Sequence, residues 1–384
     1  MEQKGRIVII TNANMHRQSG DVTLIIRRAR AIYDLSGKET VCLLLKDKEI
    51  STDEKGITYK AISHKYEMAG FLKEIKPEKV IFFGIRSFKY ISFVKRVFIK
   101  EKMNTELICD IQGVPEEFIE FKQGLNKILS YPLFLYKKYL LKQGIVASDG
   151  SFIVSSEMRK YLNELKGPKK QNDYKFYKIR CGIEEFISSE QKLAWRNEIR
   201  SEIGVNENTH IFVFSGYRMP WQKLDEILNI FQYYDMNADN VFFAIFCNID
   251  KEFSEKIERM FPKKNYLLKF LKRDEYYKYL VACDLGFLIR DIKTTNRVAF
   301  PNKFSDYLNA GLTVAMNESV SEPFEILKKY NVDYINTKDI RNIETLEEVM
   351  LRRKKSLDEY YRVTERICNS ELSYENQLKS EGFI

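Results

Sequence analysis

Short apolar runs rich in β-branched and aromatic residues alternate with amphipathic stretches along almost all of this 384-residue chain. In the first half, the runs occupy residues 6–11, 41–45, 79–84, 106–111 and 151–156, with a helical pattern over 21–35. The alternation resumes at residues 210–216, 240–247, 265–270, 284–289 and 312–316. Such a rhythm is typical of parallel sheets covered by helices. We therefore predict an α/β fold with two open sheets in tandem.

A polar segment rich in helix breakers, residues 167–173, separates the two series of runs. The chain length suits two domains, since domains commonly have about 100 to 200 residues. We predict an N-terminal domain over 1–184 and a C-terminal domain over 185–355. The charged helical pattern that follows, 356–384, is expected to return to the N-terminal domain.

Composition excludes several classes of protein. With 44% hydrophobic and 30% charged residues, the chain is neither disordered nor fibrous. It contains no run of about 18 uncharged apolar residues, and residues 1–14 resemble a strand rather than a secretory signal. We therefore expect a cytoplasmic protein. No Gly-x-Gly-x-x-Gly follows any expected strand, so nicotinamide or flavin binding of the usual kind is not predicted.

The net charge of +9 belongs to one half of the chain. Residues 1–170 carry 31 Lys and Arg against 20 Asp and Glu, a difference of +11, whereas residues 171–384 carry 32 against 34, a difference of −2. Residues 87–102 and 125–142 combine Lys and Arg with aromatic and aliphatic residues at helical spacing. Such helices bind anionic membrane surfaces, and we expect these two to contact the inner face of the cell membrane. The alternative for each is a core-facing helix with a solvated basic side.

Cations and an acid follow two of the expected strands in the second half. Arg218 and Lys223 come after the strand at 210–216, near a helix N-terminus, where charge and free amides suit a diphosphate. Lys303 and Asp306 lie on the first turns of another helix, where the acid suits ribose hydroxyls and the lysine suits phosphate. The alternatives are solvated surface cations and a capped helix with an i,i+3 ion pair of about 0.2 to 0.5 kcal/mol.

The stretch from residue 282 to 316, with PNKFSDYLNAGLTVAM at its end, closely resembles the donor-binding block of retaining glycosyltransferases of family 4. Four further segments resemble family motifs: DIQGVPEEF (110–118), SSEMRKYL (155–162), YKIRCGIEEF (177–186) and FSGYRMPWQKLDEIL (214–228). The resemblance implies the glycosyltransferase B fold, with two facing Rossmann-like domains. It also implies sugar transfer from a nucleotide-sugar donor to a lipid-linked glycan, in bacterial surface polysaccharide assembly such as that of capsule or lipopolysaccharide.

The resemblance also assigns roles to residues. It implies that Arg218 and Lys223 bind the donor diphosphate and stabilise its departure, and that Asp306 binds the ribose. Around them, the donor-binding residues implied are Asn302, Lys303, Arg290, Arg297, Ser19 and Gly20. The acceptor-side residues implied are His16, Asp110, Gln112 and Gly113. Since no Asp-x-Asp sequence occurs, neither a metal nor any other cofactor is predicted. A nucleic-acid partner is not predicted either, because no base-stacking or groove-entering element is evident.

Two positions depart from the family pattern. A sugar-binding Glu is often found eight residues before the ribose acid, where this chain has Val298, and a His or Arg is often found where it has Gln112. These departures support an alternative hypothesis, a catalytically weak or inactive member that binds a glycan or nucleotide within a polysaccharide assembly complex. A third possibility is a nucleotide-sugar epimerase, but the extra acid and base groups for that reaction are not found.

Overall fold

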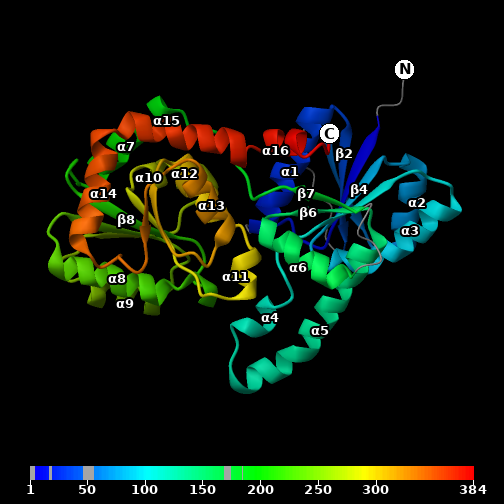
Figure 1. The fold of residues 1–384 in the computed structure, drawn as a ribbon, viewed down its shortest axis with the longest axis horizontal. Coiled ribbons are helices and arrows are strands. Elements are labelled where there is room, and N and C mark those ends of the chain that lie inside the picture. The colour runs from blue at the N-terminus through cyan, green and yellow to red at the C-terminus, as the bar shows by residue number, and fades with distance from the viewer. Residues whose placement is uncertain (1–4, 17–19, 46–55, 168–173, 184) are drawn as a thin grey trace. The chain divides into compact units, whose positions relative to one another are not determined.

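The structure is a computed structural model that describes residues 5–16, 20–45, 56–167, 174–183 and 185–384. The chain divides into two compact units (Figure 1). The first unit contains Met1–Glu184, Lys293–Phe300 and Ser373–Ile384, and the second contains Glu185–Ile292 and Pro301–Leu372. The sequence-based division treats 185–355 as one uninterrupted domain, and it does not anticipate that 293–300 groups with the first unit.

The first unit is built on a seven-stranded parallel sheet with the order β3-β2-β1-β4-β5-β6-β7. The strands are β1 (Arg6–Thr11), β2 (Glu39–Leu45), β3 (Ile57–Ile62), β4 (Lys79–Phe83), β5 (Glu106–Asp110), β6 (Gly150–Ile153) and β7 (Lys175–Lys178). Their side chains are largely buried, because helices cover both faces of a parallel sheet. Thr11 pairs with Phe83, and Phe83 with Asp110, so β1, β4 and β5 end level. The loops after these strands therefore meet at one edge.

The helices of the first unit are α1 (Gly20–Ser36), α2 (Lys65–Ile75), α3 (Ile91–Lys100), α4 (Glu117–Glu120), α5 (Gly124–Ala147), α6 (Ser156–Lys166), α11 (Thr294–Val298) and α16 (Tyr374–Ser380), with a 3-10 turn, η1 (Ser87–Tyr90), before α3. The helix α5 contains Pro132, and α4 packs against it. The helix α16 packs on α1. None of the described helices is both long and apolar enough to cross a membrane.

The second unit is built on a six-stranded parallel sheet with the order β10-β9-β8-β11-β12-β13. Its strands are β8 (His210–Ser215), β9 (Val241–Phe246), β10 (Tyr266–Lys269), β11 (Leu285–Leu288), β12 (Thr313–Met316) and β13 (Tyr334–Asn336). Its helices are α7 (Ser189–Glu202), α8 (Leu224–Asn237), α9 (Lys251–Met260), α10 (Arg273–Val281), α12 (Asn302–Asn309), α13 (Ser321–Lys329), α14 (Ile343–Lys355) and α15 (Leu357–Ile367), with a 3-10 turn, η3 (Pro220–Gln222), before α8. The two parallel sheets confirm the predicted α/β class.

Aromatic side chains form the centre of the second core. The Phe231 ring stacks on Phe243 at 5.0 Å and meets Phe287 edge-on at 5.1 Å. Such pairs add about 0.5 to 1.5 kcal/mol each beyond the burial of their area. They fix α8 on the strands β9 and β11, which precede the loops of the candidate site.

A buried ion cluster ties helices to the amino end of this sheet. Asp284, just before β11, accepts hydrogen bonds from Arg196 (2.6 Å), Arg353 (2.9 Å) and Arg200 (3.2 Å). The Ile211 amide donates to the same carboxylate at 2.8 Å. The arginines hold the pKa of Asp284 well below its usual range despite complete burial. This group, which we call the Asp284 cluster, joins α7 and α14 to β8 and β11.

The C-terminal helical pattern is interrupted rather than continuous. A π-helical turn over Cys368–Leu372 follows α15, and Ser373 then accepts a hydrogen bond from the Asn376 amide to begin α16. Because Ser373 acts as a new N-cap, the segment forms two helices. The helix α15 belongs to the second unit and α16 to the first.

Candidate active site

A glycine, Gly216, follows the carboxyl end of β8 at a position where a side chain does not fit. Gly216 has φ +120°, and a Cβ at this position would lie 2.8 Å from Cε and 3.2 Å from Nζ of Lys303. Lys303, on the first turn of α12, is 8% exposed, and its amine lies 4.0 Å from the centre of the Phe214 ring. The bare backbone of Gly216 therefore makes room for the lysine that the sequence assigns to phosphate.

Lys303 and Arg290 are two buried cations without a carboxylate partner among the described residues. Burial lowers the pKa of Lys303 well below its usual value, and the nearby Arg290 lowers it further. Burial also lowers the pKa of Arg290 to about 10. The guanidinium of Arg290 donates to the Trp221 carbonyl at 2.8 Å. Since a buried cation is costly unless it is paired, both positions favour a negatively charged ligand.

Arg218 and Lys223, the predicted catalytic cations, already have acidic partners. Arg218 forms an ion pair with Asp250, and Lys223 contacts Asp291 at 3.0 Å and Glu226 at 3.2 Å. Both cations line a cavity of about 720 Å³. Lys223 has a left-handed backbone, φ 54° and ψ 37°, which costs a residue with a side chain about 1 to 2 kcal/mol. Strain of this kind occurs often at functional sites.

Asp306 is half-buried on α12, where Tyr277 donates a hydrogen bond of 2.7 Å to its Oδ1. Nearby polar atoms have no hydrogen-bond partner although they are buried: Oδ1 of Asn302, Oε1 of Gln222 and Nε of Arg218. Buried polar atoms in folded proteins are nearly always paired. Unpaired atoms beside the unpaired Lys303 amine are therefore consistent with a polar ligand.

Arg297 and Val298 lie in the first unit, on α11, whereas Arg290, Asn302 and Lys303 belong to the second. Arg297 contacts Glu157 of α6 at 3.7 Å. Val298 is buried, and its carbonyl accepts a hydrogen bond of 2.6 Å from Ser155. The side chain at the position of the family's glutamate is therefore apolar and buried.

The predicted acceptor-side residues lie at the carboxyl edge of the first sheet, but in different environments. Asp110 is buried, with Arg28 and Gln112 as partners. Gln112 and Gly113 line a cavity of about 600 Å³, which Asp110 does not line. His16 is exposed and is not among the residues lining this cavity. Ser19 lies outside the described residues, and Gly20 is the first residue of α1.

The same cavity is lined by Asp21, which ends the loop expected to approach donor and acceptor, and by Arg86, Glu117 and Lys137, which were not predicted as site residues. Burial, and then the charge of Asp21, raises the pKa of Glu117 to about 7. Arg86 follows β4 by a few residues, so reading every strand end would have found it. Lys137 gave no such signal, because its helix starts elsewhere and reaches this edge only in the fold. Metal-binding groups of three or more His, Cys, Asp or Glu are absent from the described part of the chain.

No family model matches the sequence, and no curated protein matches it. Solved structures do match over nearly the whole chain. Sucrose-phosphate synthase from Thermosynechococcus elongatus has a TM-score of 0.73 at 8% identity, with 99% of this chain and 98% of that chain covered. WaaG, a glycosyltransferase involved in lipopolysaccharide biosynthesis, has a TM-score of 0.65 at 12% identity, with 98% and 99% covered.

A third structure, Anabaena Alr3699/HepE in complex with UDP and glucose, has a TM-score of 0.67 at 12% identity, with 99% of each chain covered. At these identities the likeness concerns the fold. Both sheets and their order along the chain are matched, because the coverage is almost complete on either side. The chain therefore has the glycosyltransferase B fold.

Proposed function

We propose that this protein is a glycosyltransferase that moves a sugar from a nucleotide-sugar donor to a glycan acceptor. The proposal rests on two buried cations without a carboxylate partner among the described residues, Lys303 beside Gly216 and the nearby Arg290. A structure of similar fold contains UDP and glucose, which agrees with a nucleotide-sugar donor. Asp306 is the proposed ligand of the ribose hydroxyls, in competition with its present partner Tyr277.

The proposed reaction breaks the bond between the sugar C1 and the donor phosphate and forms a bond from C1 to an acceptor hydroxyl oxygen. The hydroxyl proton passes to the departing phosphate. Arg218, Lys223 and Lys303 stabilise the charge that develops on the diphosphate, which is electrostatic catalysis of leaving-group departure. We propose that the reaction retains the anomeric configuration, as in family 4. Proton NMR of the product, read at the anomeric coupling constant, tests this point directly.

The donor site is tested by thermal-shift measurements with UDP, GDP, CMP, ADP and dTDP and their common sugars. A ligand that binds only the folded chain raises the melting temperature by mass action. We expect a selective shift that is lost in Asp306→Ala. The matched control is Asp239→Ala, an exposed acid in the connection before β9, at the opposite edge of the sheet.

A shift that Asp306→Ala leaves unchanged would remove the ribose role. Nucleotide binding without transfer or donor hydrolysis across a panel of acceptors would instead favour the second candidate, a binding partner in polysaccharide assembly. One observation supports that candidate: Arg218 and Lys223 are both engaged by carboxylates, which a donor diphosphate must displace.

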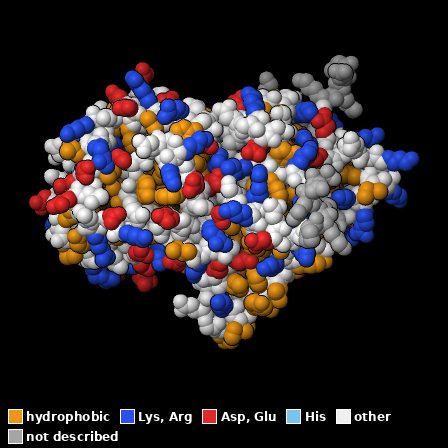
Figure 2. All heavy atoms as spheres, viewed as in Figure 1, with side chains coloured by type: hydrophobic (Ala, Val, Ile, Leu, Met, Phe, Trp, Pro, Cys, Tyr) orange, Lys and Arg blue, Asp and Glu red, His pale blue; other side chains and the backbone are white. Residues whose placement is uncertain are grey.

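We further propose that the acceptor is lipid-linked and that α5 contacts an anionic membrane surface. The first half of α5 has exposed apolar side chains, including Leu125 (69%), Ile128 (68%) and Leu129 (68%). Hydrophobic side chains gather over this part of the molecule in Figure 2, and in Figure 1 the same segment extends away from the sheet of its unit. Residues 121–148 contain five lysines and no acid. Such a surface suits the interface of an anionic bilayer.

The other basic segment, residues 87–102, contains α3, whose apolar side is buried. The membrane proposal therefore concerns α5 alone. Ile91, Val94 and Phe98 of α3 are buried, and its half-buried Lys95 donates to the Ala147 carbonyl at 2.8 Å. Only Arg96 and Lys100 of its cations are exposed. Vesicle co-sedimentation distinguishes the two helices. We expect Leu129→Gln to weaken binding to anionic vesicles and Ile99→Gln, an equally exposed position on α3, to leave it unchanged. Equal effects of the two substitutions would contradict a specific role of α5.

A further inference from the structure

Lys137 of α5 is the most unusual charged residue of the first unit. It is only 4% exposed, and its amine has no hydrogen bond or ion pair with any residue that the structure describes. The centre of the Phe118 ring lies 5.8 Å from the amine. Burial lowers the pKa of Lys137 to about 8, with a further contribution from Arg86. A buried lysine without a partner costs free energy, which a bound anion would recover.

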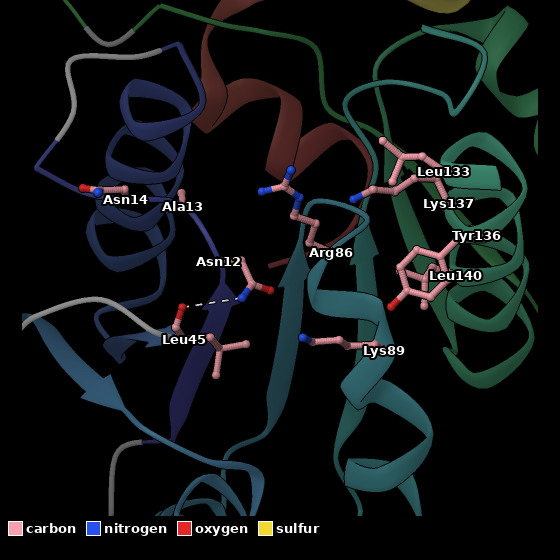
Figure 3. Close-up of a pocket in the computed structure, with 10 residues that line it drawn as sticks. All are labelled: Asn12, Ala13, Asn14, Leu45, Arg86, Lys89, Leu133, Tyr136, Lys137 and Leu140. Carbon is pink, nitrogen blue, oxygen red and sulfur yellow. Dashed lines mark hydrogen bonds between the residues drawn. The ribbon is translucent and has the colours of Figure 1, made fainter. Parts of the chain in front are cut away.

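Two further cations surround the same space. Arg86 and Lys89 line a cavity of about 320 Å³ together with Lys137, and both are exposed. In Figure 3 the amines of Lys89 and Lys137 extend toward the side of the cavity where Asn12 lies, with Arg86 near Lys137. Within the described residues, none of the three has a carboxylate within ion-pair distance. As far as the structure describes the chain, the cavity therefore has three positive charges and no carboxylate bound to them.

Uncharged polar and apolar side chains also line the cavity of about 320 Å³. Asn12 donates to the Leu45 carbonyl at 3.5 Å, and its Oδ1 is buried without a partner. Leu133 and Tyr136 line the cavity from α5, and both are also partly exposed, like Leu125, Ile128 and Leu129 of the same helix. An anionic head group can thus lie against the cations while an attached apolar chain follows α5.

The neighbouring cavity differs from the smaller one because acids also line it. The 600 Å³ cavity shares Arg86 and Lys137 with the smaller one but is also lined by Asp21 and Glu117. Burial raises the pKa of both acids. Carboxyl groups suit sugar hydroxyls and repel phosphate, so the two cavities differ in the ligand groups that they favour.

From this geometry we infer that the cavity of Arg86, Lys89 and Lys137 binds a phosphate or diphosphate group of the acceptor substrate. The inference rests on the proposed glycosyltransferase function and specifies its acceptor class. The acceptor hydroxyls lie on the side of Asp21 and Glu117, and the phosphate lies on the side of Lys89. The phosphate belongs either to a lipid-linked glycan or to a soluble phosphorylated sugar.

The test measures binding of inorganic pyrophosphate to the full chain by calorimetry. All variants carry Lys223→Gln and Lys303→Met, which weaken the donor site. We expect Lys137→Met to raise the Kd at least tenfold and Lys142→Met, an exposed lysine on the same helix, to leave it within twofold. Glu117→Gln should lower the Kd, because it removes a negative charge from the neighbouring cavity.

The Glu117→Gln variant separates the inference from a purely structural role. If Lys137 only balances Glu117 inside the fold, this substitution destabilises the protein and leaves the Kd unchanged. Such a result, or equal losses in Lys137→Met and Lys142→Met, overturns the anion site. Failure of the proposed function is recognised separately, since nucleotide sugars would then give no thermal shift in the protein without substitutions.

A diphosphate on a lipid and a dissolved pyrophosphate together show whether the acceptor is lipid-linked or soluble. Phosphatidylcholine vesicles with a polyprenyl diphosphate are compared with vesicles that contain the uncharged polyprenol and with dissolved pyrophosphate. Binding that needs the diphosphate on the vesicle and is lost in Lys137→Met assigns a lipid-linked acceptor. Equal affinity for dissolved pyrophosphate and for the vesicle-bound diphosphate assigns a soluble phosphorylated acceptor. No Lys137-dependent binding in either form contradicts the site.

Discussion

Each unit contains a group of three cations, and the two groups differ in what they surround. In the Asp284 cluster, Arg196, Arg200 and Arg353 share one carboxylate and also donate to backbone carbonyls such as those of Ala282 and Gly311. In the first unit, the three cations Arg86, Lys89 and Lys137 surround a cavity. The first group lies at the amino end of its sheet and the second at the carboxyl end, where α/β proteins bind ligands.

The cations around Asp284 hold the fold together, whereas the cations around the cavity are available to a ligand. Arg196, Arg200 and Arg353 share the negative charge of Asp284, so their removal affects folding. Lys137 has no such partner among the described residues, so its removal affects binding. Arg218 and Lys223 fall between these cases, because their carboxylate partners are exposed enough for a ligand to replace.

The largest effect is expected from Asp284→Ala. The substitution leaves three buried or nearly buried guanidinium groups without a counter-charge, which typically costs about 3 to 5 kcal/mol. Denaturant unfolding should show this loss in the free energy of unfolding. Asp333→Ala is the control, since Asp333 is an exposed acid paired with Arg352 at 3.1 Å, and such pairs contribute about 0 to 1 kcal/mol. Similar losses in both variants would mean that the Asp284 cluster has no special role.

Lys303→Met should change the free energy of unfolding less than Asp284→Ala does. It should nevertheless lower the rate of sugar transfer strongly. Methionine preserves an unbranched chain over Phe214 and removes the amine, so the fold should remain stable. The loss of one group that stabilises the leaving diphosphate should lower turnover about 10² to 10³-fold. Steady-state rates and the melting temperature are measured together. A variant with full turnover would exclude Lys303 from the reaction, and one that unfolds would place it with the Asp284 cluster.

The sequence predicted the architecture well because its signals are local. Runs such as residues 6–11 and 210–216 are strands in the structure, since alternation of apolar runs and amphipathic stretches reports directly on a helix-covered parallel sheet. The strands β3 and β13 were missed, because polar residues interrupt the apolar run of β3 and β13 has only three residues. The break before α16 was missed as well, because Ser373 resembles any polar residue of a charged helix until its hydrogen bond to Asn376 is seen.

Site residues were predictable only where a motif or a strand end marked them. The stretch containing Lys303 and Asp306 could be located from its spacing, and Gly216 follows its strand directly. Lys137 lies in the middle of a long basic helix, where sequence cannot separate it from Lys138 or Lys142. Only the fold buries one of these lysines and exposes another. The two basic helices likewise resembled each other in sequence, and tertiary packing covers the apolar side of α3 but not that of the first half of α5.

The next effect concerns pH and uses sulfate, whose charge is constant between pH 6 and 9. The charged groups that face Lys137 are Arg86, Lys89 and Glu117, and Asp21 faces Glu117. As pH rises, Glu117 gains a negative charge near pH 7 and Lys137 loses its positive charge near pH 8. Both changes weaken anion binding, so sulfate affinity should fall about tenfold or more by pH 9. Lys137→Met should keep only the decrease near pH 7, and a flat profile in the unsubstituted protein would contradict the site.

The smallest effect is expected in the stability of Lys137→Met. Because the folded state lowers the pKa of Lys137 to about 8, protonated Lys137 destabilises the fold at neutral pH. Methionine should therefore raise the free energy of unfolding by about 1 kcal/mol at pH 7. The gain should shrink as pH rises from about 8 toward the unfolded pKa of about 10.4, where the lysine is neutral in both states. Lys142→Met should stay within about 0.5 kcal/mol throughout. A loss of stability in Lys137→Met would mean that this lysine, like the arginines around Asp284, serves the fold rather than a ligand.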